Sequence, residues 1–196
     1  MKHIFLGLIL FSTSIQAGLS ANVSFASDYI WRGMTQTDGS ALQGGFDFKS
    51  ESGFYLGMWG SNVNFNNGNG QELDRYMGYS FTQGPIGVDL GYIIYEYPDS
   101  NPNLEFEETY LGLNILEFGV TYAKGKDFAP NYVEYSYNRG NFRVAYGKYD
   151  NFGNNSTASY DLLCGSFTCS IGFYKFSDKE YNQDDDGLFL SISATL

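Results

Sequence analysis

Few residues in this chain could do chemistry, and histidine is almost absent. The one histidine, His3, lies in an amino-terminal segment that we expect to be removed. A chain without histidine lacks the usual general base for a serine nucleophile and the commonest ligand of transition metals. Glu107 and Glu108 are adjacent, so on a strand they point to opposite faces and cannot work as a pair. We therefore expect no enzyme, no catalytic residue and no cofactor.

The most acidic segment of the chain spans residues 178–186. It contains Asp184-Asp185-Asp186, followed by Gly187, and Asp178 and Glu180 lie close by in the sequence. Clustered carboxylates can bind Ca²⁺, but this spacing does not match a calcium-binding loop. A solvated acidic loop is the interpretation that we prefer, and we predict no metal site.

The two cysteines flank a short polar stretch. Cys164 and Cys169 enclose Gly-Ser-Phe-Thr, and by the alternation of a strand they share a face. A hairpin here would pair Leu162 with Ile171, which would bring the two thiols opposite each other. In an exported protein such a pair is expected to form a structural disulfide, the alternative being two free thiols.

The amino terminus is typical of a secretory signal peptide. Lys2 precedes an apolar run from Ile4 to Phe11, and small or polar residues lead to Ala17. The apolar run is too short for a spanning helix, which favours a cleaved signal peptide. We predict cleavage after Ala17. Residues 1–17 are then the signal peptide and 18–196 one domain. The formal net charge of −11 argues against a nucleic-acid partner, since phosphate contacts need basic side chains.

The rest of the chain alternates with a period of two. In residues 86–94, IGVDLGYII, one face carries Ile86, Val88, Leu90, Tyr92 and Ile94, whereas Asp89 lies among glycines on the other. Alternation indicates a strand with two unlike faces. We predict twelve strands of about ten residues, the length that crosses a bilayer when tilted. They lie near 20–30, 41–49, 54–64, 72–82, 86–97, 105–114, 116–124, 131–138, 141–150, 156–164, 167–176 and 187–196.

Short and long connections alternate between these strands. Longer polar loops include WRGMTQTDGS (31–40) and SDKEYNQDDD (177–186), and the tight turns are Glu51-Ser52, Gln83-Gly84, Ile115-Leu116, Arg139-Gly140 and Gly165 to Thr168. Folding at Arg139-Gly140 would pair Tyr137 with Phe142, and folding at Gln83-Gly84 would pair Phe81 with Ile86. This pattern predicts an all-β fold, a transmembrane antiparallel up-and-down β-barrel of 12 strands with both termini periplasmic.

The alternation also assigns side chains to the two faces of the barrel. The predicted outward set is apolar and includes Val23, Phe46, Leu90, Leu111 and Ile171. The charged residues predicted to face the lumen are Asp47, Lys49, Asp89, Glu108, Glu117, Glu134, Arg143 and Asp161. Aromatic residues gather near strand ends, and two girdles at the headgroups would use Tyr29, Trp31, Tyr95, Tyr97 and Tyr149 at one rim and Phe48, Phe54, Phe81, Tyr137 and Phe142 at the other. The alternative is that aromatic residues simply favour strands.

Residues 22–63 carry a set of motifs that resembles a bacterial family. The motif residues are Ser27-Asp28-Tyr29, Arg32-Gly33, Thr35-Gln36, Gln43-Gly44-Gly45-Phe46-Asp47 and Trp59-Gly60-Ser61-Asn62. They are similar to those of the TorF-type porins, also catalogued as the Gcw_chp family of bacterial outer-membrane proteins. The chain departs from the family pattern at its end, which is Leu196 where members commonly have Phe. The resemblance implies an outer-membrane barrel and carries no substrate with it.

Three functions remain open at this point. The first is a narrow, cation-preferring outer-membrane channel for passive diffusion of small polar solutes or ions, because the predicted lumen has six acids and two bases. The second is a structural or surface-display barrel whose lumen is plugged. The third is a secreted soluble barrel that binds a ligand. The first two would have outer-membrane lipid and, during biogenesis, the barrel-assembly machinery as partners.

Overall fold

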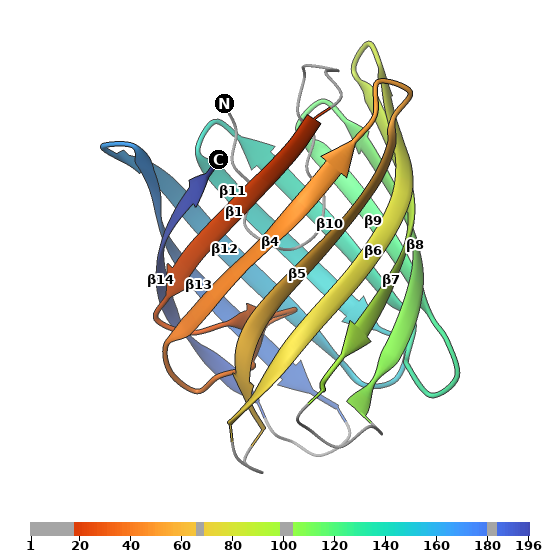
Figure 1. Ribbon diagram of the computed structural model, residues 1–196. Coiled ribbons are helices and arrows are strands. Elements are labelled where there is room, and N and C mark those ends of the chain that lie inside the picture. Colours follow the sequence, from red (N-terminus) through yellow and green to blue (C-terminus); the bar gives the residue numbers. More distant parts are fainter. Residues whose placement is uncertain (1–17, 66–68, 99–103, 180–183) are drawn as a thin grey trace.

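The computed structural model describes residues 18–65, 69–98, 104–179 and 184–196 as one closed barrel (Figure 1). Twelve antiparallel strands follow one another around it in chain order, and β1 closes against β14. They are β1 (Gly18–Ala26), β4 (Ala41–Lys49), β5 (Phe54–Asn64), β6 (Asn69–Gln83), β7 (Ile86–Glu96), β8 (Phe106–Ile115), β9 (Phe118–Gly125), β10 (Tyr132–Arg139), β11 (Phe142–Tyr149), β12 (Gly153–Cys164), β13 (Phe167–Asp178) and β14 (Asp185–Thr195).

The predicted fold class is confirmed, and the strand bounds differ from the prediction by only a few residues. Both ends of the described chain lie at the end of the barrel that carries the tight turns, and the longer loops lie at the opposite end (Figure 1). We refer to these as the tight-turn end and the long-loop end. The predicted signal peptide, residues 1–17, lies outside the described residues, as does part of the acidic loop, 180–183.

The predicted register of three hairpins is wrong by two residues. Tyr137 pairs with Val144 rather than Phe142, Phe81 pairs with Val88, and Leu162 pairs with Cys169. The cause lies in the turns, whose two-residue loops begin at Gly84, Gly140 and Gly165 with positive φ. Primed hairpin turns require positive φ at their first central residue, which sets the register. A shift of two residues preserves the face of every side chain, so the assignment of faces is unaffected.

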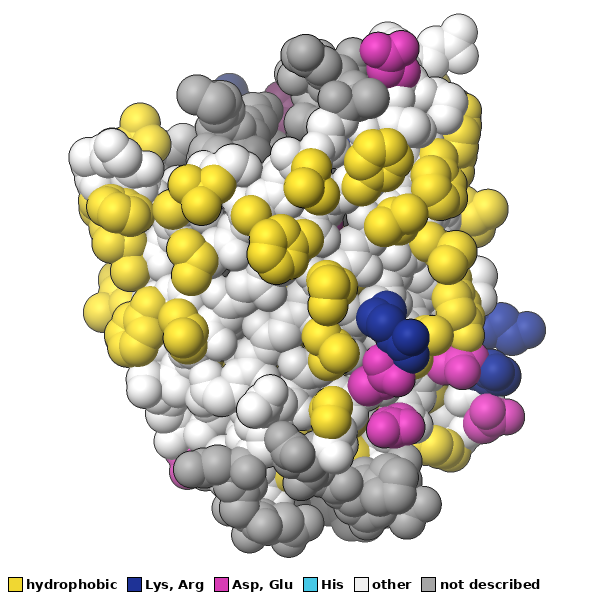
Figure 2. Space-filling view, in the orientation of Figure 1, with side chains coloured by type: hydrophobic (Ala, Val, Ile, Leu, Met, Phe, Trp, Pro, Cys, Tyr) yellow, Lys and Arg dark blue, Asp and Glu magenta, His cyan; other side chains and the backbone are white. Residues whose placement is uncertain are grey.

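The outer surface of the barrel is apolar and the inner surface is polar. Leu90, Leu111 and Ile171 point outward and are about half exposed, whereas Asp89, between Val88 and Leu90, is buried inside. Figure 2 shows apolar side chains spread over the outer wall, with charged ones gathered toward the long-loop end. This is the inverse of a soluble sheet and is the pattern of a barrel that faces lipid. No helix among the described residues is long and apolar enough to span a membrane.

One of the two predicted aromatic girdles is wrong. Phe48, Phe54, Phe81 and Phe142 are exposed on the outer wall at the tight-turn end. The five residues assigned to the other rim instead join an aromatic cluster inside the barrel: Tyr29, Trp31, Tyr95, Tyr97 and Tyr149. Strand parity explains the result, because Tyr95 shares the inward face of Asp89 and Tyr149 shares that of Arg143. The long-loop half of the lumen is therefore filled largely by aromatic side chains.

Inward glycines make room for these rings. A Cβ atom on Gly91 would lie 2.3 Å from the hydroxyl oxygen of Tyr110, and one on Gly147 would lie 1.9 Å from that of Tyr132. Each tyrosine thus crosses the neighbouring strand over a residue that has no side chain, and its hydroxyl reaches a polar partner beyond. Glycine is therefore needed at both positions, where any side chain would overlap a tyrosine.

Candidate functional site: a hairpin inside the barrel

The segment between β1 and β4 folds into the lumen. It forms a small hairpin of β2 (Ile30–Trp31) and β3 (Met34–Thr35), with Trp31 opposite Met34. The sequence predicts an external polar loop at 31–40, and that prediction is wrong. Its polar residues find partners on the inner wall, as described below, so the segment does not need bulk solvent. We call residues 27–40 the inner segment.

The tip of this hairpin is a tight turn that only certain residues can form. Arg32 has a φ of 49° and Gly33 a φ of 80°, so both central residues are left-handed, as a type I′ turn requires. Gly33 also lies against the wall: an added Cβ would be 2.6 Å from Cβ of Asn155 and 2.8 Å from the carbonyl oxygen of Lys175. Glycine is thus required at the tip for its backbone and for its size.

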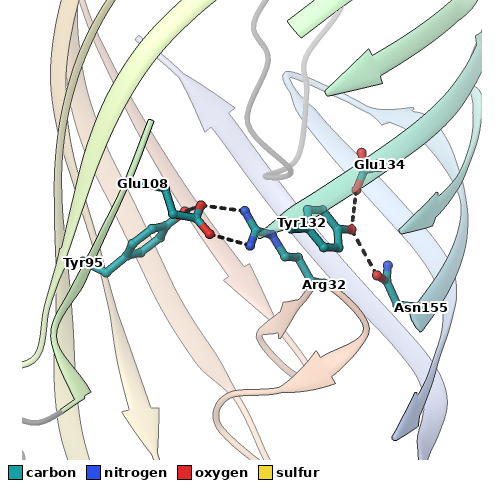
Figure 3. Close-up of polar contacts among 6 residues, drawn as sticks. All are labelled: Arg32, Tyr95, Glu108, Tyr132, Glu134 and Asn155. Atoms are coloured by element: carbon teal, nitrogen blue, oxygen red, sulfur yellow. Dashed lines mark hydrogen bonds and ion pairs between the residues drawn. The ribbon is translucent and has the colours of Figure 1, made fainter. Parts of the chain in front are cut away.

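Arg32 extends from this tip to the opposite wall. β9 lies opposite β1 around the ring of strands, and Arg32 reaches Glu108 on β8 and Tyr132 on β10, the two neighbours of β9 (Figure 3). Its Nη1 and Nη2 atoms donate to Oε1 and Oε2 of Glu108 over 2.8 and 2.7 Å. The side chains are only 13 % and 2 % exposed. A bidentate pair of this kind fixes orientation as well as charge.

Aromatic faces hold the guanidinium from both sides. Its carbon atom lies 4.0 Å from the ring centre of Tyr132 and 4.5 Å from that of Trp31. Trp31 in turn packs edge-on against Tyr95, with ring centres 5.8 Å apart, and Tyr95 donates to Oε2 of Glu108 over 3.3 Å. Cation–π contacts add to the ion pair where water is excluded. Arg32 therefore links the inner segment to the far wall.

The base of the inner segment is fixed by a second set of hydrogen bonds. The hydroxyl groups of Thr35 and Thr37 donate to Oδ1 of Asp28 over 2.7 and 2.8 Å. The backbone N–H of Thr35 donates to Oδ2 of Asp185 on β14, and that of Gln36 donates to the carbonyl oxygen of Tyr29. The segment is thus anchored at its base as well as at its tip.

Next to Arg32, a polar network extends along the inner wall formed by β10, β11 and β12. The hydroxyl of Tyr132 lies 3.1 Å from Oε2 of Glu134 and 3.0 Å from Oδ1 of Asn155 (Figure 3). Arg143 donates to Oε1 of Glu134 over 2.9 Å. Two of the lumen charges, Arg143 and Glu134, therefore neutralise each other.

Toward the tight-turn end, the inner wall carries carboxylates held by neutral donors. Asp89 accepts from the hydroxyl of Tyr55 over 2.7 Å, and Asp161 accepts from that of Ser170 over 2.6 Å. Asp47 accepts from Tyr76 and from Asn22. Within the described part of the chain, none of these three carboxylates has a basic group within ion-pair distance.

Two further predicted lumen residues differ in their placement. Lys49 is partly exposed, on the same face of β4 as Asp47. Glu117 lies in the exposed turn after β8, so it does not line the lumen as the sequence led us to expect. The reason is the turn itself: the strand ends at Ile115, two residues before Glu117, and face alternation no longer applies.

The charged residues that the sequence analysis did not assign to the lumen include three in the described interior: Arg32, Glu72 and Asp74. Arg32 was assigned to an external loop, and Glu72 and Asp74 of β6 were overlooked, although all three lie inside the barrel. The signal for the last two was present, because they alternate with Leu73 and Arg75 and share a face with Tyr76. The single base in an otherwise polar loop gave no comparable signal for Arg32.

Several residues of the family motif lie around the inner segment, whereas Phe46 is exposed on the outer wall and Asp47 lies toward the tight-turn end. Trp59 packs edge-on against Tyr29, with ring centres 5.3 Å apart. Asn62 of β5 accepts from the N–H of Leu42 and donates to the carbonyl oxygen of Ser40. The oxygen of Gln43 accepts from Ser24 over 3.4 Å. The remaining motif residues lie in the inner segment or on two strands. Ser27 belongs to the segment, β4 carries Gly44, Gly45, Phe46 and Asp47, and β5 carries Gly60 and Ser61.

A cavity of about 160 Å³ lies inside the barrel beside the inner segment. Trp31 and Arg32 of the segment form part of its lining, and so do Asp74, Glu108 and Arg143 of the wall. The lumen thus contains unfilled space, and Arg32 forms part of the lining of that space.

A disulfide joins Cys164 and Cys169 at the tight-turn end, far from this site. The cysteines are diagonal neighbours, because Cys164 pairs with Phe167 and Cys169 with Leu162, and their Cα atoms are 5.9 Å apart. The described residues include no group of three or more acidic, histidine or cysteine side chains placed to hold a metal ion.

Twelve closed strands with an apolar outside and a polar inside define a β-barrel of the outer-membrane type. The chain belongs to the Gcw_chp family, described as bacterial protein of unknown function, whose model matches residues 12–182. No curated protein sequence matches the chain.

A solved structure shares the fold. A KdgM porin superposes with a TM-score of 0.61 at 8 % identity, over 89 % of this chain and 98 % of that one. OccK1 (OpdK) of Pseudomonas aeruginosa has a TM-score of 0.41 at 13 % identity, over 89 % of this chain and 60 % of that one. At 8 % identity the similarity to the KdgM porin establishes the architecture alone.

Proposed function

We propose that this chain is a narrow outer-membrane channel of the TorF type, through which small polar solutes or ions diffuse passively with a preference for cations. The observation that carries the proposal is the pairing of a lipid-compatible outer wall with a cavity in a carboxylate-rich lumen. On this account residues 1–17 direct export and are removed, the barrel-assembly machinery inserts the barrel, and the tight-turn end with both termini faces the periplasm.

The preference for cations follows from the balance of charges along the inner wall. Arg32 is paired with Glu108, and Arg143 with Glu134. The carboxylates of Asp47, Asp89 and Asp161 have neutral hydroxyl or amide donors, and Lys49 is close enough to Asp89 to act on its charge. Three acids against this one base leave a net negative charge on the wall. Fixed carboxylates in a narrow pore attract cations and raise their local concentration.

A plugged structural barrel is the second candidate, and one observation favours it. The inner segment and the aromatic cluster fill much of the long-loop half of the lumen. A secreted soluble barrel is opposed by the apolar outer wall, since a continuous exposed surface of this kind is unfavourable in water. The secreted soluble barrel predicts that the protein is extracted without detergent. The membrane barrel predicts that extraction needs detergent and that the gel mobility of the protein changes on boiling.

Swelling of proteoliposomes tests the channel against the plug. Vesicles that contain the purified protein are mixed with isotonic potassium chloride or with the uncharged pentose arabinose, and uptake is followed by light scattering. The channel predicts uptake of both solutes above protein-free vesicles. Asp89→Asn, which changes charge at nearly constant volume, should change the rate of salt uptake, in which chloride must accompany potassium, and leave arabinose uptake unchanged. Absence of uptake of either solute by the wild type would favour the plugged barrel.

A further inference from the structure

Two buried carboxyl groups of β6 have no role in the contacts described so far. Glu72 is 3 % and Asp74 is 1 % exposed, and both side chains point inward. They lie close enough to repel each other when both are ionised. Oε1 of Glu72 accepts from the hydroxyl of Tyr29 over 3.3 Å, and the Asp74 carboxyl and the Tyr97 hydroxyl also lie near Glu72. Oε2 of Glu72 and Oδ1 of Asp74 nevertheless make no hydrogen bond of good geometry within the described structure.

No base among the described residues forms an ion pair with either carboxyl group. The only cation that the described structure places on the nearby hairpin is Arg32, and Glu108 takes both of its terminal nitrogens. Two adjacent ionised carboxylates without a counter-charge are costly to bury. Polar atoms that are buried without a partner also call for an explanation, such as an ion. The two orphaned oxygens therefore point to a positive ligand.

The surroundings give such a ligand access and enclosure. Asp74 lines the cavity inside the barrel, so an ion in the lumen can reach it without crossing the wall. Aromatic residues lie around the pair: Tyr29 and Trp59 pack together, and Tyr97 is close enough to Glu72 to interact with it. Carboxylate and hydroxyl oxygens are hard donors of the kind that calcium prefers, and water can complete its coordination.

We propose that Glu72 and Asp74, with the hydroxyl of Tyr29, form a binding site for one divalent, oxygen-seeking cation inside the barrel. Two carboxylates match the charge of such an ion. Because Tyr29 belongs to the inner segment, the bound ion would also tie that segment to β6. If permeating cations bind at this site as they cross the barrel, that role rests on the proposed function. Binding of the ion itself can be measured without any ion conduction.

The experiment is a terbium titration of the folded protein in detergent, with calcium as competitor. Terbium luminescence excited through aromatic side chains reports an ion close to Trp59 and Tyr29. Asp184→Asn/Asp186→Asn serves as the background for all measurements, which lowers the charge of the acidic loop and weakens binding there. Heat-modifiable gel mobility of every variant establishes that it is folded.

The site predicts saturable, calcium-displaced luminescence from one bound ion. Glu72→Gln and Asp74→Asn should each weaken binding about tenfold or more, because ligand charge sets affinity in such sites. Asp89→Asn, a lumen carboxylate that already has a donor, should bind as the background does. No saturable signal, or equal affinity in the Glu72→Gln/Asp74→Asn double variant, would overturn the site and indicate a shared proton instead. Whichever result is obtained, the swelling experiment tests separately whether the protein is a channel.

Discussion

Replacing Arg32 with methionine should release the inner segment from the far wall. The change keeps an unbranched side chain but removes both hydrogen bonds to Glu108 and the stacking on Tyr132. It also leaves Glu108, at 2 % exposure, as a buried carboxylate without a counter-charge. Breaking one side of a buried pair typically costs about 3–5 kcal/mol, and loss of the cation–π contacts adds about 0.5–2 kcal/mol.

This cost shifts the position of the inner segment rather than the stability of the whole barrel. The twelve-strand ladder does not depend on Arg32, whereas the hairpin holds its place through its tip and its base. At about 1.4 kcal/mol per tenfold change, a loss of about 3–5 kcal/mol raises the displaced population by roughly two to three and a half orders of magnitude. The bonds of Thr35 and Thr37 to Asp28 remain and limit how far the segment can move.

Single-channel recording and hydrogen exchange together measure the effect. We expect Arg32→Met to give larger or more frequent conductance steps than the wild type, with faster amide exchange in peptides that cover residues 28–37. The matched control is Arg143→Met, which breaks another lumen ion pair but leaves the hairpin attached. If Arg32→Met and the wild type show the same steps and the same exchange, the inner segment is not held by this pair and the reasoning is wrong.

Three other substitutions test separate parts of the structure. Gly33→Ala should displace the hairpin in the same direction as Arg32→Met, because the left-handed backbone costs about 1–2 kcal/mol and the new methyl group would overlap the wall; exchange of residues 28–37 measures it. Leu111→Arg should destabilise the folded barrel by about 2–4 kcal/mol in lipid, the cost of a mid-bilayer base, as read from urea unfolding in vesicles. Cys164→Ser/Cys169→Ser should lower the unfolding free energy by about 2 kcal/mol through loss of the cross-link, and mass spectrometry should find the wild type about two protons lighter than its reduced form.

Each of these has a control or a result that would contradict it. Gly140→Ala imposes the same backbone strain at a φ of 60° with nothing within 4 Å of the new atom, so it should leave the hairpin in place. Leu116→Arg, in an exposed turn, should be tolerated, and equal tolerance of Leu111→Arg would argue against a lipid-facing wall. Alkylation of both cysteines without reductant in isolated outer membranes would show that the disulfide is not formed there.

Alternation was sufficient to predict the barrel. Each strand has to present one face to lipid and one to the lumen, so a period of two appears directly in stretches such as 86–94. The register of the hairpins was predicted wrongly because it depends on which turn residue takes positive φ. Gly140 takes positive φ as the first residue of its loop. The error of two residues was invisible to the face pattern, since it moves no side chain to the other face.

The site was harder to predict than the fold for a physical reason. A loop rich in Thr, Asp, Gly and Arg satisfies its polar groups equally well in water or against a polar inner wall, so composition does not say which way it folds. The tyrosines on the inner wall could have been assigned by parity, as Tyr95 shows. The bond between Arg32 and Glu108 spans 76 positions along the chain, and no local pattern indicates such a contact.

The sign of the reversal potential across a potassium chloride gradient tests the central claim most directly. Purified wild-type protein is inserted into a planar bilayer, and the voltage of zero current is read from single channels. The uncompensated carboxylates of the lumen predict small conductance steps and a reversal potential displaced toward the equilibrium potential of potassium. A displacement toward that of chloride, or no steps in the wild type and in Arg32→Met alike, would contradict the account.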